Sequence, residues 1–167
     1  IDYEQRANSF VIRNVQIGIG FHWNQYEDEE FEGSLEIIHN PDGTETAVNT
    51  IDIESYLTSV ISSEMSADAP LELLKAQAVI ARSWVMRAIG HTSHTSFDVC
   101  ADDHCQRYYG IARRNARTIE AVHATRGQVL TYQPLCLSAS LPNSSPTGGG
   151  REGALICDCR YHKCCGG

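Results

Sequence analysis

The sequence predicts an α+β fold in which a β-rich N-terminal segment is followed by a central pair of helices, and then by a further helix and strands. Three observations support this prediction. Apolar and polar residues alternate within residues 1–50, apolar residues recur at helical spacing from residue 52 to residue 89, and turn-forming residues separate these stretches. The chain has 167 residues, the length of one domain with a substantial core.

Residues 1–50 are expected to form strands. The apolar members of an alternating, half-buried strand are Val11, Val15, Ile17 and Ile19. Segments 36–38 and 46–48 flank the turn sequence Asn40-Pro41-Asp42-Gly43, and together they predict a hairpin. The acidic run 27–30 is interpreted as a solvated loop and not as a metal site, because blocks of like charge repel one another and stay hydrated.

Two adjacent helices are expected at Asp52–Met65 and Pro70–Ile89. The first carries an apolar stripe, and Glu64 stands one turn beyond Val60 and Ile61 on that stripe. A carboxyl group in this position either reaches water at the end of the helix or is partly removed from water. In the second case it keeps its proton more readily, as a general acid must. Periodicity alone leaves both interpretations open.

The second helix begins with two favourable residues, Pro70 at the expected first position and Glu72 in the first turn. Lys75 and Arg82 are seven residues apart, so they are expected to project from one face of this helix. They are interpreted either as surface charges or as cations that orient a bound ligand.

A polar stretch rich in histidine and cysteine follows the helix pair. His94, Cys100 and Cys105 have the type and close spacing of zinc ligands. His104, His91, a residue elsewhere in the fold, or water would complete such a site. A disulfide between Cys100 and Cys105, or two reduced thiols, are the alternatives.

The chain contains seven cysteines, an odd number, so they cannot all pair with one another. Five of them crowd the tail, namely Cys136, Cys157, Cys159, Cys164 and Cys165. Adjacent Cys164 and Cys165 are poorly placed to bridge each other, so metal binding or disulfides with scattered partners are expected in the tail.

Further elements are expected between the polar stretch and the tail. The expected helix runs from Arg113 to His123 before Gly127, and its apolar face is formed by Ala112, Ala116 and Ile119. A strand is expected from Gln128 to Tyr132. Residues 133–153 are interpreted as a loop-like insertion, because residues 137–150 are rich in Ser, Pro and Gly.

The overall charge and hydropathy exclude some classes of function. A net charge of −8 makes nucleic acid an unsuitable partner, because binding to phosphates relies on clustered Lys and Arg. No stretch is long and apolar enough to span a membrane. The chain begins with Ile and shows no basic and apolar leader, so any export signal is expected to lie outside this sequence.

Several short segments between residues 48 and 132, about half of the chain, follow one another in a specific order and spacing. They are Val48-Asn49, Tyr56-Leu57, Ser63-Glu64-Met65, Leu74-Lys75-Ala76-Gln77-Ala78-Val79, Ala81-Arg82-Ser83-Trp84 and Thr125-Arg126-Gly127-Gln128-Val129-Leu130-Thr131-Tyr132. In these segments the chain resembles the stage II sporulation protein D (SpoIID/LytB) family of cell-wall proteins.

The resemblance implies a lyase, a lytic transglycosylase that cleaves the β-1,4 bond between N-acetylmuramic acid (MurNAc) and N-acetylglucosamine (GlcNAc) in peptidoglycan glycan strands. It implies that Glu64 is the acid and base that forms 1,6-anhydro ends. Gln106 and Tyr109 match a family segment at the mouth of the glycan groove, and Lys75 and Arg82 are candidates for orienting the sugar. Some family members bind zinc at the stretch that contains His94, Cys100 and Cys105, where the metal would be structural.

The resemblance also implies a single SpoIID-like domain over residues 1–167, located outside the cytoplasm in the cell envelope. It is expected to comprise a β-rich N-terminal segment over residues 1–50, a helical core over residues 51–125, and a strand and cysteine-rich tail over residues 126–167 with the insertion 133–153. Family domains continue beyond such a tail, so a C-terminally truncated domain is expected. A cell-wall amidase is the expected protein partner.

Two other functions stay open at this point. One is a non-catalytic peptidoglycan-binding module or amidase enhancer, for which Glu64 would be dispensable. The other is a structural or redox zinc protein, whose activity would follow the state of the metal or the thiols.

Overall fold

The computed structural model describes residues 1–18, 22, 24–91, 94–132, 135–136 and 153–157. It confirms the α+β fold class. The elements in chain order are β1 (Tyr3–Gln5), β2 (Ser9–Ile17), β3 (Gln25–Glu32), β4 (Ser34–His39), β5 (Glu45–Asp52), α1 (Ile53–Glu64), α2 (Leu71–Ala88), β6 (Val99–Cys100), α3 (Ala116–Ala124), β7 (Thr131–Tyr132), β8 (Leu135–Cys136) and β9 (Gly153–Cys157).

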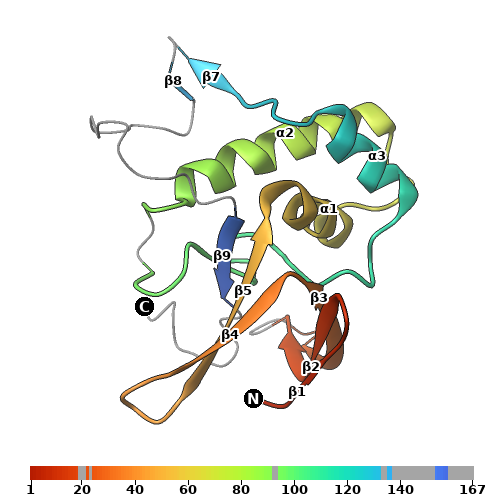
Figure 1. The fold of residues 1–167 in the computed structure, drawn as a ribbon. Helices are drawn as coiled ribbons and strands as arrows, with labels where there is room; N and C mark the ends of the chain where they lie inside the picture. The colour runs from red at the N-terminus through yellow and green to blue at the C-terminus, as the bar shows by residue number, and fades with distance from the viewer. Residues whose placement is uncertain (19–21, 23, 92–93, 133–134, 137–152, 158–167) are drawn as a thin grey trace.

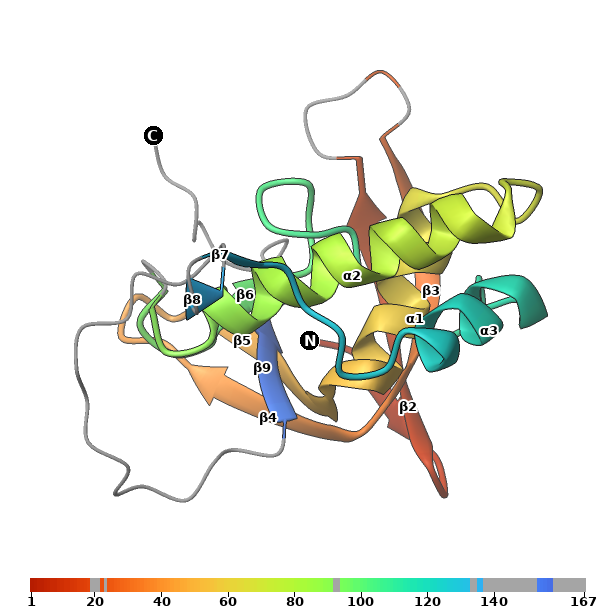
Figure 2. The same cartoon turned by 90° about the horizontal axis from the view of Figure 1, so that it is seen from above.

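The described strands form two sheets and a small hairpin. Strands β1, β2 and β3 make an antiparallel sheet, and the second sheet has the order β4-β5-β9-β6, in which β9 is antiparallel to β5 and parallel to β6. Strands β7 and β8 pair with each other. In Figures 1 and 2, α2 and α3 lie side by side, and α1 packs between them and the sheets.

The predicted hairpin is confirmed. Strand β4 pairs with β5 from Ser34↔Thr50 to His39↔Glu45, around the turn that contains Asn40 and Gly43. The alternating strand is confirmed as β2, although a bulge between Ile12 and Val15 shifts its register against β3. Residue Ile19 lies outside the described residues.

The prediction that residues 27–30 form a solvated loop is wrong. They lie within β3, where Glu29 is only 3% exposed. Neighbouring cations pair with three of the acidic side chains, although those of Glu27 and Asp28 stay 40% and 53% exposed. The ion pairs are Arg113 with Glu27 at 3.0 Å, Arg13 with Asp28 at 3.1 Å and Arg6 with Glu30 at 3.0 Å.

The two central helices begin and end within one residue of the predicted bounds. Asp52 caps α1, because its Oδ1 accepts hydrogen bonds of 3.1 Å from the backbone N–H groups of Glu54 and Ser55. Pro70 is the N-cap of α2 and not its first helical residue. Helix α2 buries Leu74, Ala78, Ala81, Arg82, Ser83 and Val85.

The third helix differs more from its prediction. It begins after Asn115, whose side chain accepts a hydrogen bond from the Thr118 N–H at 3.0 Å and so fixes the start of the helix. This later start rotates the buried face, which consists of Thr118, Ala121 and Val122 and not of Ala112, Ala116 and Ile119. The strand expected at 128–132 is limited to β7.

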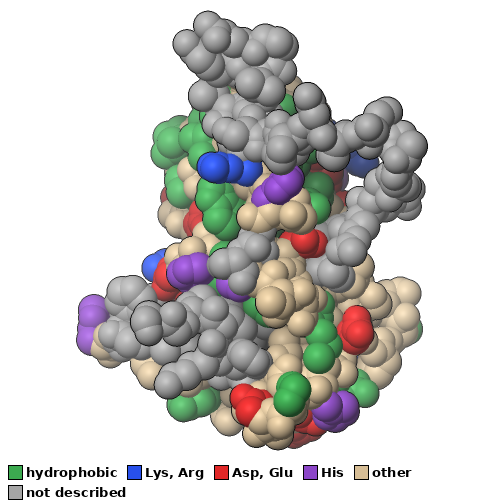
Figure 3. Space-filling view, turned by 90° about the vertical axis from the view of Figure 1, so that its left-hand side faces the viewer, with side chains coloured by type: hydrophobic (Ala, Val, Ile, Leu, Met, Phe, Trp, Pro, Cys, Tyr) green, Lys and Arg blue, Asp and Glu red, His purple; other side chains and the backbone are tan. Residues whose placement is uncertain are grey.

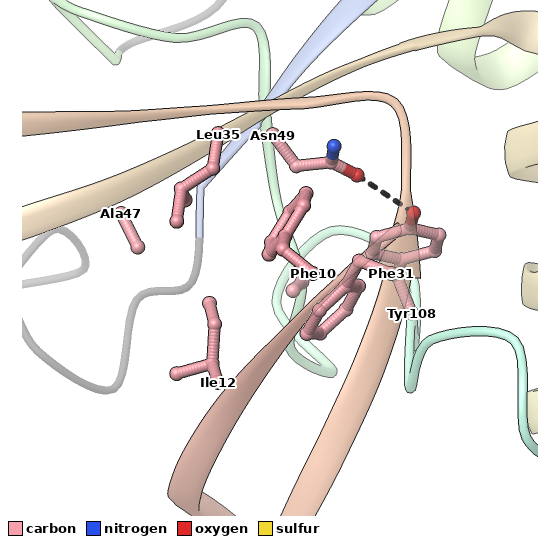
Figure 4. Close-up of a pocket in the computed structure, with 8 residues that line it drawn as sticks. Phe10, Ile12, Phe31, Leu35, Ala47, Asn49 and Tyr108 are labelled. Atoms are coloured by element: carbon pink, nitrogen blue, oxygen red, sulfur yellow. Dashed lines mark hydrogen bonds between the residues drawn. The ribbon is translucent and has the colours of Figure 1, made fainter. Parts of the chain in front are cut away.

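Aromatic side chains join the two sheets and the helices in the core. Ring contacts with centroid distances of 5.5, 5.4 and 5.1 Å run from Phe10 to Phe31, on to Tyr108 and then to Tyr56 in α1. The Tyr108 hydroxyl donates a hydrogen bond to Asn49 Oδ1 at 2.8 Å. Figure 4 shows Phe10, Phe31, Tyr108 and Asn49 around a small apolar cavity between β2, β3 and the β4–β5 hairpin. This core fixes the segment around Tyr108 against α1.

The C-terminal region is described in fragments. Residues 153–157 form β9 in the middle of the second sheet, a strand that the sequence analysis did not predict at these residues. Within the interpreted insertion 133–153, β8 pairs with β7, while 133–134 and 137–152 lie outside the described residues. The remainder of the cysteine-rich tail, 158–167, lies outside them as well. None of the described helices has the length and apolar character needed to cross a membrane.

Candidate functional site

Glu64 is the last residue of α1, and its side chain is half-buried. Its Oε2 accepts a hydrogen bond from the side-chain amide of Gln77 in α2, with an Nε2 to Oε2 distance of 3.0 Å. Within the segments of the chain that the structure describes, no group donates to the second oxygen, Oε1. The carboxyl group is thus held by one oxygen, and the other is available to a ligand.

Ser63 connects the end of α1 to the segment that follows the histidine and cysteine stretch. Its Oγ donates to Ser59 O at 2.7 Å and accepts a hydrogen bond of 3.2 Å from the Tyr109 N–H. The Tyr109 ring is buried, and the Arg113 guanidinium lies 4.9 Å from its centroid. The backbone of Tyr109 is therefore fixed directly beside Glu64.

Gln106 lies in the core between α1 and α2. Its Oε1 accepts a hydrogen bond of 3.0 Å from the Tyr56 hydroxyl, and its Nε2 donates to Ala81 O at 3.3 Å. Burial, together with nearby negative charges that include Glu64, raises the pKa of Tyr56 well above its usual value. Tyr56 therefore stays a neutral donor, and the amide of Gln106 is engaged within the protein.

Arg82 is buried, with a side chain that is 1% exposed. Its Nε and Nη2 donate to the two carboxylate oxygens of Glu54 at 2.9 and 2.8 Å, and its guanidinium also donates to the carbonyl oxygens of Gln128 and Val122. The interpretation of Arg82 as a surface charge is wrong, because its guanidinium is buried and paired with groups of the protein. Arg82 ties α1 to α3 and the following turn, and this geometry gives no support to a sugar-binding role.

Lys75 remains near the surface. Its side chain is 28% exposed, and its Nζ donates to Glu72 Oε1 at 2.7 Å, one turn earlier in α2. Arg107 is a cation whose pKa responds to Glu64. A hydrogen bond with Asp103 is the main cause that raises the pKa of Arg107, and the negative charges of Asp103, Tyr109 and Glu64 add to it.

The predicted metal ligands come together. The donor atoms of His94, Cys100, His104 and Cys105 all lie within 4.8 Å of one another. Cys105 Sγ is 3.4 Å from His94 Nε2 and 3.6 Å from His104 Nδ1, and Cys100 Sγ is 3.9 Å from the same His104 nitrogen. Cys100 and Cys105 are not bonded to each other in the structure, so they do not form the alternative disulfide.

The three distances of 3.4 to 3.9 Å are close to those of a tetrahedral metal site. Zn–S bonds of about 2.3 Å and Zn–N bonds of about 2.0 Å place neighbouring ligand atoms of a tetrahedron about 3.3 to 3.8 Å apart. Two thiols and two imidazoles are the donor set that zinc prefers in closed, structural sites. Among the fourth ligands considered from the sequence, the structure brings His104 into the cluster and not His91.

Gln77 is the residue that sequence analysis missed. The sequence showed that it belongs to a family-like segment, but its contact with Glu64 depends on how α1 and α2 face each other. Helical periodicity gives the direction of a side chain around its own helix and not the neighbour that it meets.

Comparisons with known proteins agree with the resemblance seen in the sequence. A family model described as SpoIID, stage II sporulation protein, matches residues 41–132. An uncharacterized protein of Brachyspira hyodysenteriae is 38% identical over 105 residues, which cover 62% of this chain and 28% of that protein. The amidase enhancer of Bacillus subtilis is 38% identical over 98 residues, which cover 58% of this chain and 12% of that protein. The chain thus spans less than a third of either relative, and no solved structure matches.

Proposed function

The chain belongs to the stage II sporulation protein (SpoIID) family, and from this premise we propose that it is a lytic transglycosylase of peptidoglycan glycan strands. The bond cleaved is the β-1,4 bond between MurNAc and GlcNAc, and the product carries a 1,6-anhydro end. The observation that carries the proposal is the half-buried Glu64, which is held through Oε2 by Gln77 and offers Oε1 to a ligand.

A single carboxyl group is sufficient for this reaction. Protonated Glu64 gives its proton to the glycosidic oxygen of GlcNAc while the bond from that oxygen to C1 of MurNAc breaks. The resulting carboxylate then takes the proton of the C6 hydroxyl as O6 bonds to C1, which closes the 1,6-anhydro ring and returns Glu64 to its protonated form. Hydrolytic glycosidases instead use a pair of carboxylates and a water molecule.

Acid and base catalysis by one residue accounts for only a fraction of such a rate. A positioned acid or base typically contributes about a hundredfold to ten-thousandfold, so orientation and electrostatic support must supply the rest. Lys75 is proposed to bind the sugar because it is partly exposed. Gln106 and Tyr109 are proposed to support the binding surface from within the core and not to contact the sugar, since their side chains are buried.

We propose in addition that the four-residue cluster holds a structural zinc ion. His94, Cys100, His104 and Cys105 would bind the metal, and four protein ligands would leave no position for a substrate. The ion would supply a cross-link of the segment that leads from α2 to Gln106. A role in placing Glu64 would then be indirect, through the fixed segment 106–109.

The name of the Bacillus subtilis relative favours a second candidate, a glycan-binding module that enhances a cell-wall amidase. Both candidates imply a protein of the cell envelope that acts outside the cytoplasm. They differ in whether Glu64 is required.

Mass spectrometry of purified, peptide-free glycan strands after incubation with the protein tests the proposal. Strands ending in 1,6-anhydro-MurNAc are expected with the unmodified protein and absent with Glu64→Gln. Glu120→Gln, at an exposed position of α3, is the matched control and should behave as the unmodified protein. Strand binding without cleavage by any of the three proteins would reject the transglycosylase and favour the enhancer.

A further inference from the structure

A cleft beside the C-terminal end of α2 is not used by the chemistry proposed for Glu64. Its volume is about 260 Å³. Trp84, Arg87 and His91 line one side of it, and three members of the histidine and cysteine cluster line the other. Figure 3 views the molecule from the side of Figure 1 on which α2 ends, and basic and histidine side chains lie near hydrophobic ones on this face.

Trp84, Arg87 and His91 all border the cleft from the C-terminal end of α2. Arg87 follows Trp84 by three residues, which is the spacing of neighbours on one face of a helix, and His91 lies just beyond the end of α2, after the turn at Gly90, and also lines the cleft. Trp84 is 38% exposed, although a large aromatic side chain is usually more fully buried. An exposed indole face beside a basic group is a typical anchor for a ligand.

The charge of the cleft is unusual for this protein. The chain has 21 acidic and 13 basic residues, yet none of the described residues that line the cleft is acidic. Arg87 forms no hydrogen bond or ion pair with any residue that the structure describes. A zinc ion bound by two thiolates and two neutral imidazoles would have no net charge, so it would not cancel the charge of Arg87. The cleft is thus suited to an anion.

The cleft and Glu64 lie along the same side of α2. Gln77, which holds Glu64, and Trp84 are two turns apart, or about 10 Å at the 1.5 Å rise per residue of a helix. The segment 105–109 connects the same two places, because Cys105 lines the cleft and the Tyr109 N–H bonds to Ser63 beside Glu64. An extended chain of sugars with one bond at Glu64 would therefore reach the cleft.

We propose that this cleft is a saccharide-binding subsite for a sugar ring that carries a carboxylate. Trp84 packs against the ring, Arg87 pairs with the carboxylate, and His91 forms a hydrogen bond with the ring substituents. The inference rests on the proposed function for the identity of the polymer, since a muramic acid residue freed of its peptide carries a lactyl carboxylate. In this proposal the cleft recognises the lactyl carboxylate of a sugar that lies away from the bond that is cleaved.

Binding in the Glu64→Gln background tests the subsite without turnover. Isothermal titration calorimetry is performed with three ligands: peptide-free glycan strands, neutral chitooligosaccharides of similar length, and free stem peptide. Trp84→Ala should weaken binding of both saccharides about tenfold. Arg87→Gln should weaken binding of the carboxylate-bearing strands about tenfold, leave the neutral oligosaccharides unchanged, and make the strand affinity less sensitive to salt.

The controls are two exposed residues outside the cleft. Met86→Ala lies on another face of α2 and matches Trp84→Ala, and Arg117→Gln on α3 matches Arg87→Gln. Both should bind all ligands as the background protein does. Metal content and melting temperature of each variant establish that the cluster is intact.

Equal losses for charged and neutral saccharides in Arg87→Gln, or no loss in either cleft variant, would overturn the proposal. Binding of free stem peptide that depends on Arg87 would overturn it as well, because the carboxylate recognised would then belong to a peptide. The proposed cleavage is judged separately by the anhydro ends formed with Glu64 present. A protein that makes no such ends still gives a decisive result in the binding experiment.

Discussion

The side-chain amide of Gln77 donates a hydrogen bond to Oε2 of Glu64 across the interface of α1 and α2, at a distance of 3.0 Å. The acidic proton is less favourable on Oε2, because the amide N–H of Gln77 already occupies a lone pair of that oxygen. The proton of the neutral carboxyl group is therefore expected on Oε1. For the proposed reaction, Gln77 would act as a positioning residue that selects the oxygen used for catalysis.

Replacement of Gln77 by Met should keep the fold and slow the proposed reaction. Without the amide, the Glu64 carboxyl is free to rotate, and misplacement of a catalytic group costs up to about a hundredfold in rate. The expected result is a tenfold to hundredfold fall in kcat with KM changed less than about twofold. The measurement is the steady-state release of 1,6-anhydro ends from peptide-free strands.

A second substitution separates positioning from packing. Gln77→Glu would put two carboxyl groups within hydrogen-bond distance, and two such groups do not both ionise readily. The pH profile of kcat should then move to higher pH, an effect that a purely structural role would not produce. Gln25→Ala is the control, because Gln25 also donates to a glutamate, at an exposed position of β3. An unchanged kcat in both Gln77 variants would contradict the assignment.

The contact between Gln77 and Glu64 also shows where sequence reasoning ends. The bounds of α1 and α2 followed from local signals, since Asp52 caps the first helix and Pro70 marks the start of the second. The cluster that could hold a metal was predicted in part because close spacing along the chain keeps His94, Cys100 and Cys105 close in space. Such local relationships are encoded within a few residues.

Relationships between distant segments were predicted less well. Arg82 was expected at the surface, but Glu54 lies opposite it and compensates for the burial of its charge. The acidic run was expected to form a loop, but it lies in β3 and pairs with cations from β2, the β1–β2 turn and the segment before α3. In both cases the partner lies on another element of the fold, and periodicity contains no information about it.

Loss of the Arg82–Glu54 pair should destabilise the fold. Arg82→Met leaves Glu54 partly buried without its partner, and breaking a buried ion pair typically costs about 3 to 5 kcal/mol; the lower end is expected, because Glu54 is 16% exposed. Arg82→Lys should restore little, since an ammonium group cannot donate to both carboxylate oxygens in the same fork. Urea unfolding at neutral pH measures the free energy of unfolding.

A double variant tests whether the two residues act as a pair. Arg82→Met combined with Glu54→Leu removes both charges, so it should lose less free energy than the sum of the single variants. Arg117→Met, which changes an exposed arginine of α3, should stay within about 0.5 kcal/mol of the unmodified protein. If the free-energy loss of the double variant equals the sum of the two single losses, Arg82 and Glu54 do not stabilise the fold as a pair.

Zinc binding should depend on His104 and not on His91. The purified protein is expected to contain one zinc ion per chain, and His104→Gln should lower the affinity at least tenfold because it removes one of four ligands. His91→Gln is the matched control from the neighbouring cleft and should retain the affinity. Competition with a chromophoric chelator measures the affinity of each protein. Equal losses in the two variants would show that the ligand set is wrong.

Removal of the metal should lower the melting temperature. Binding of a ligand to the folded state stabilises it by an amount that grows with the ratio of free ligand to its dissociation constant. Excess chelator is therefore expected to destabilise the unmodified protein and to have little effect on a Cys100→Ser, Cys105→Ser double variant. Differential scanning calorimetry with and without chelator provides the comparison. A chelator effect of the same size in the double variant would place the responsible metal elsewhere.

The N-cap of α1 should make a pH-dependent contribution to stability. Partial burial is the largest single influence on the pKa of Asp52 and raises it, but hydrogen bonds from the side chain and N–H of Ser55 and from the Glu54 N–H outweigh burial. The charge of Arg126 acts in the same direction as these bonds, and the net pKa lies below its usual value. The folded state therefore favours the ionised form of this carboxyl group.

The sign of the pH dependence follows from this direction. A group whose pKa is lowered by folding stabilises the protein above its unfolded pKa, about 3.8 for Asp52, and loses that contribution as the pH falls through the folded value. At pH 7, Asp52→Ala should cost about 1 kcal/mol and Asp52→Asn less, because Asn also caps a helix. The difference in free energy of unfolding between the unmodified protein and Asp52→Ala should narrow as the pH falls below about 4. The same difference between Asp52→Asn and Asp52→Ala should stay constant. Urea unfolding of the three proteins at pH 7, 5 and 3 measures both differences, and a constant first difference would show that the charge of Asp52 does not contribute.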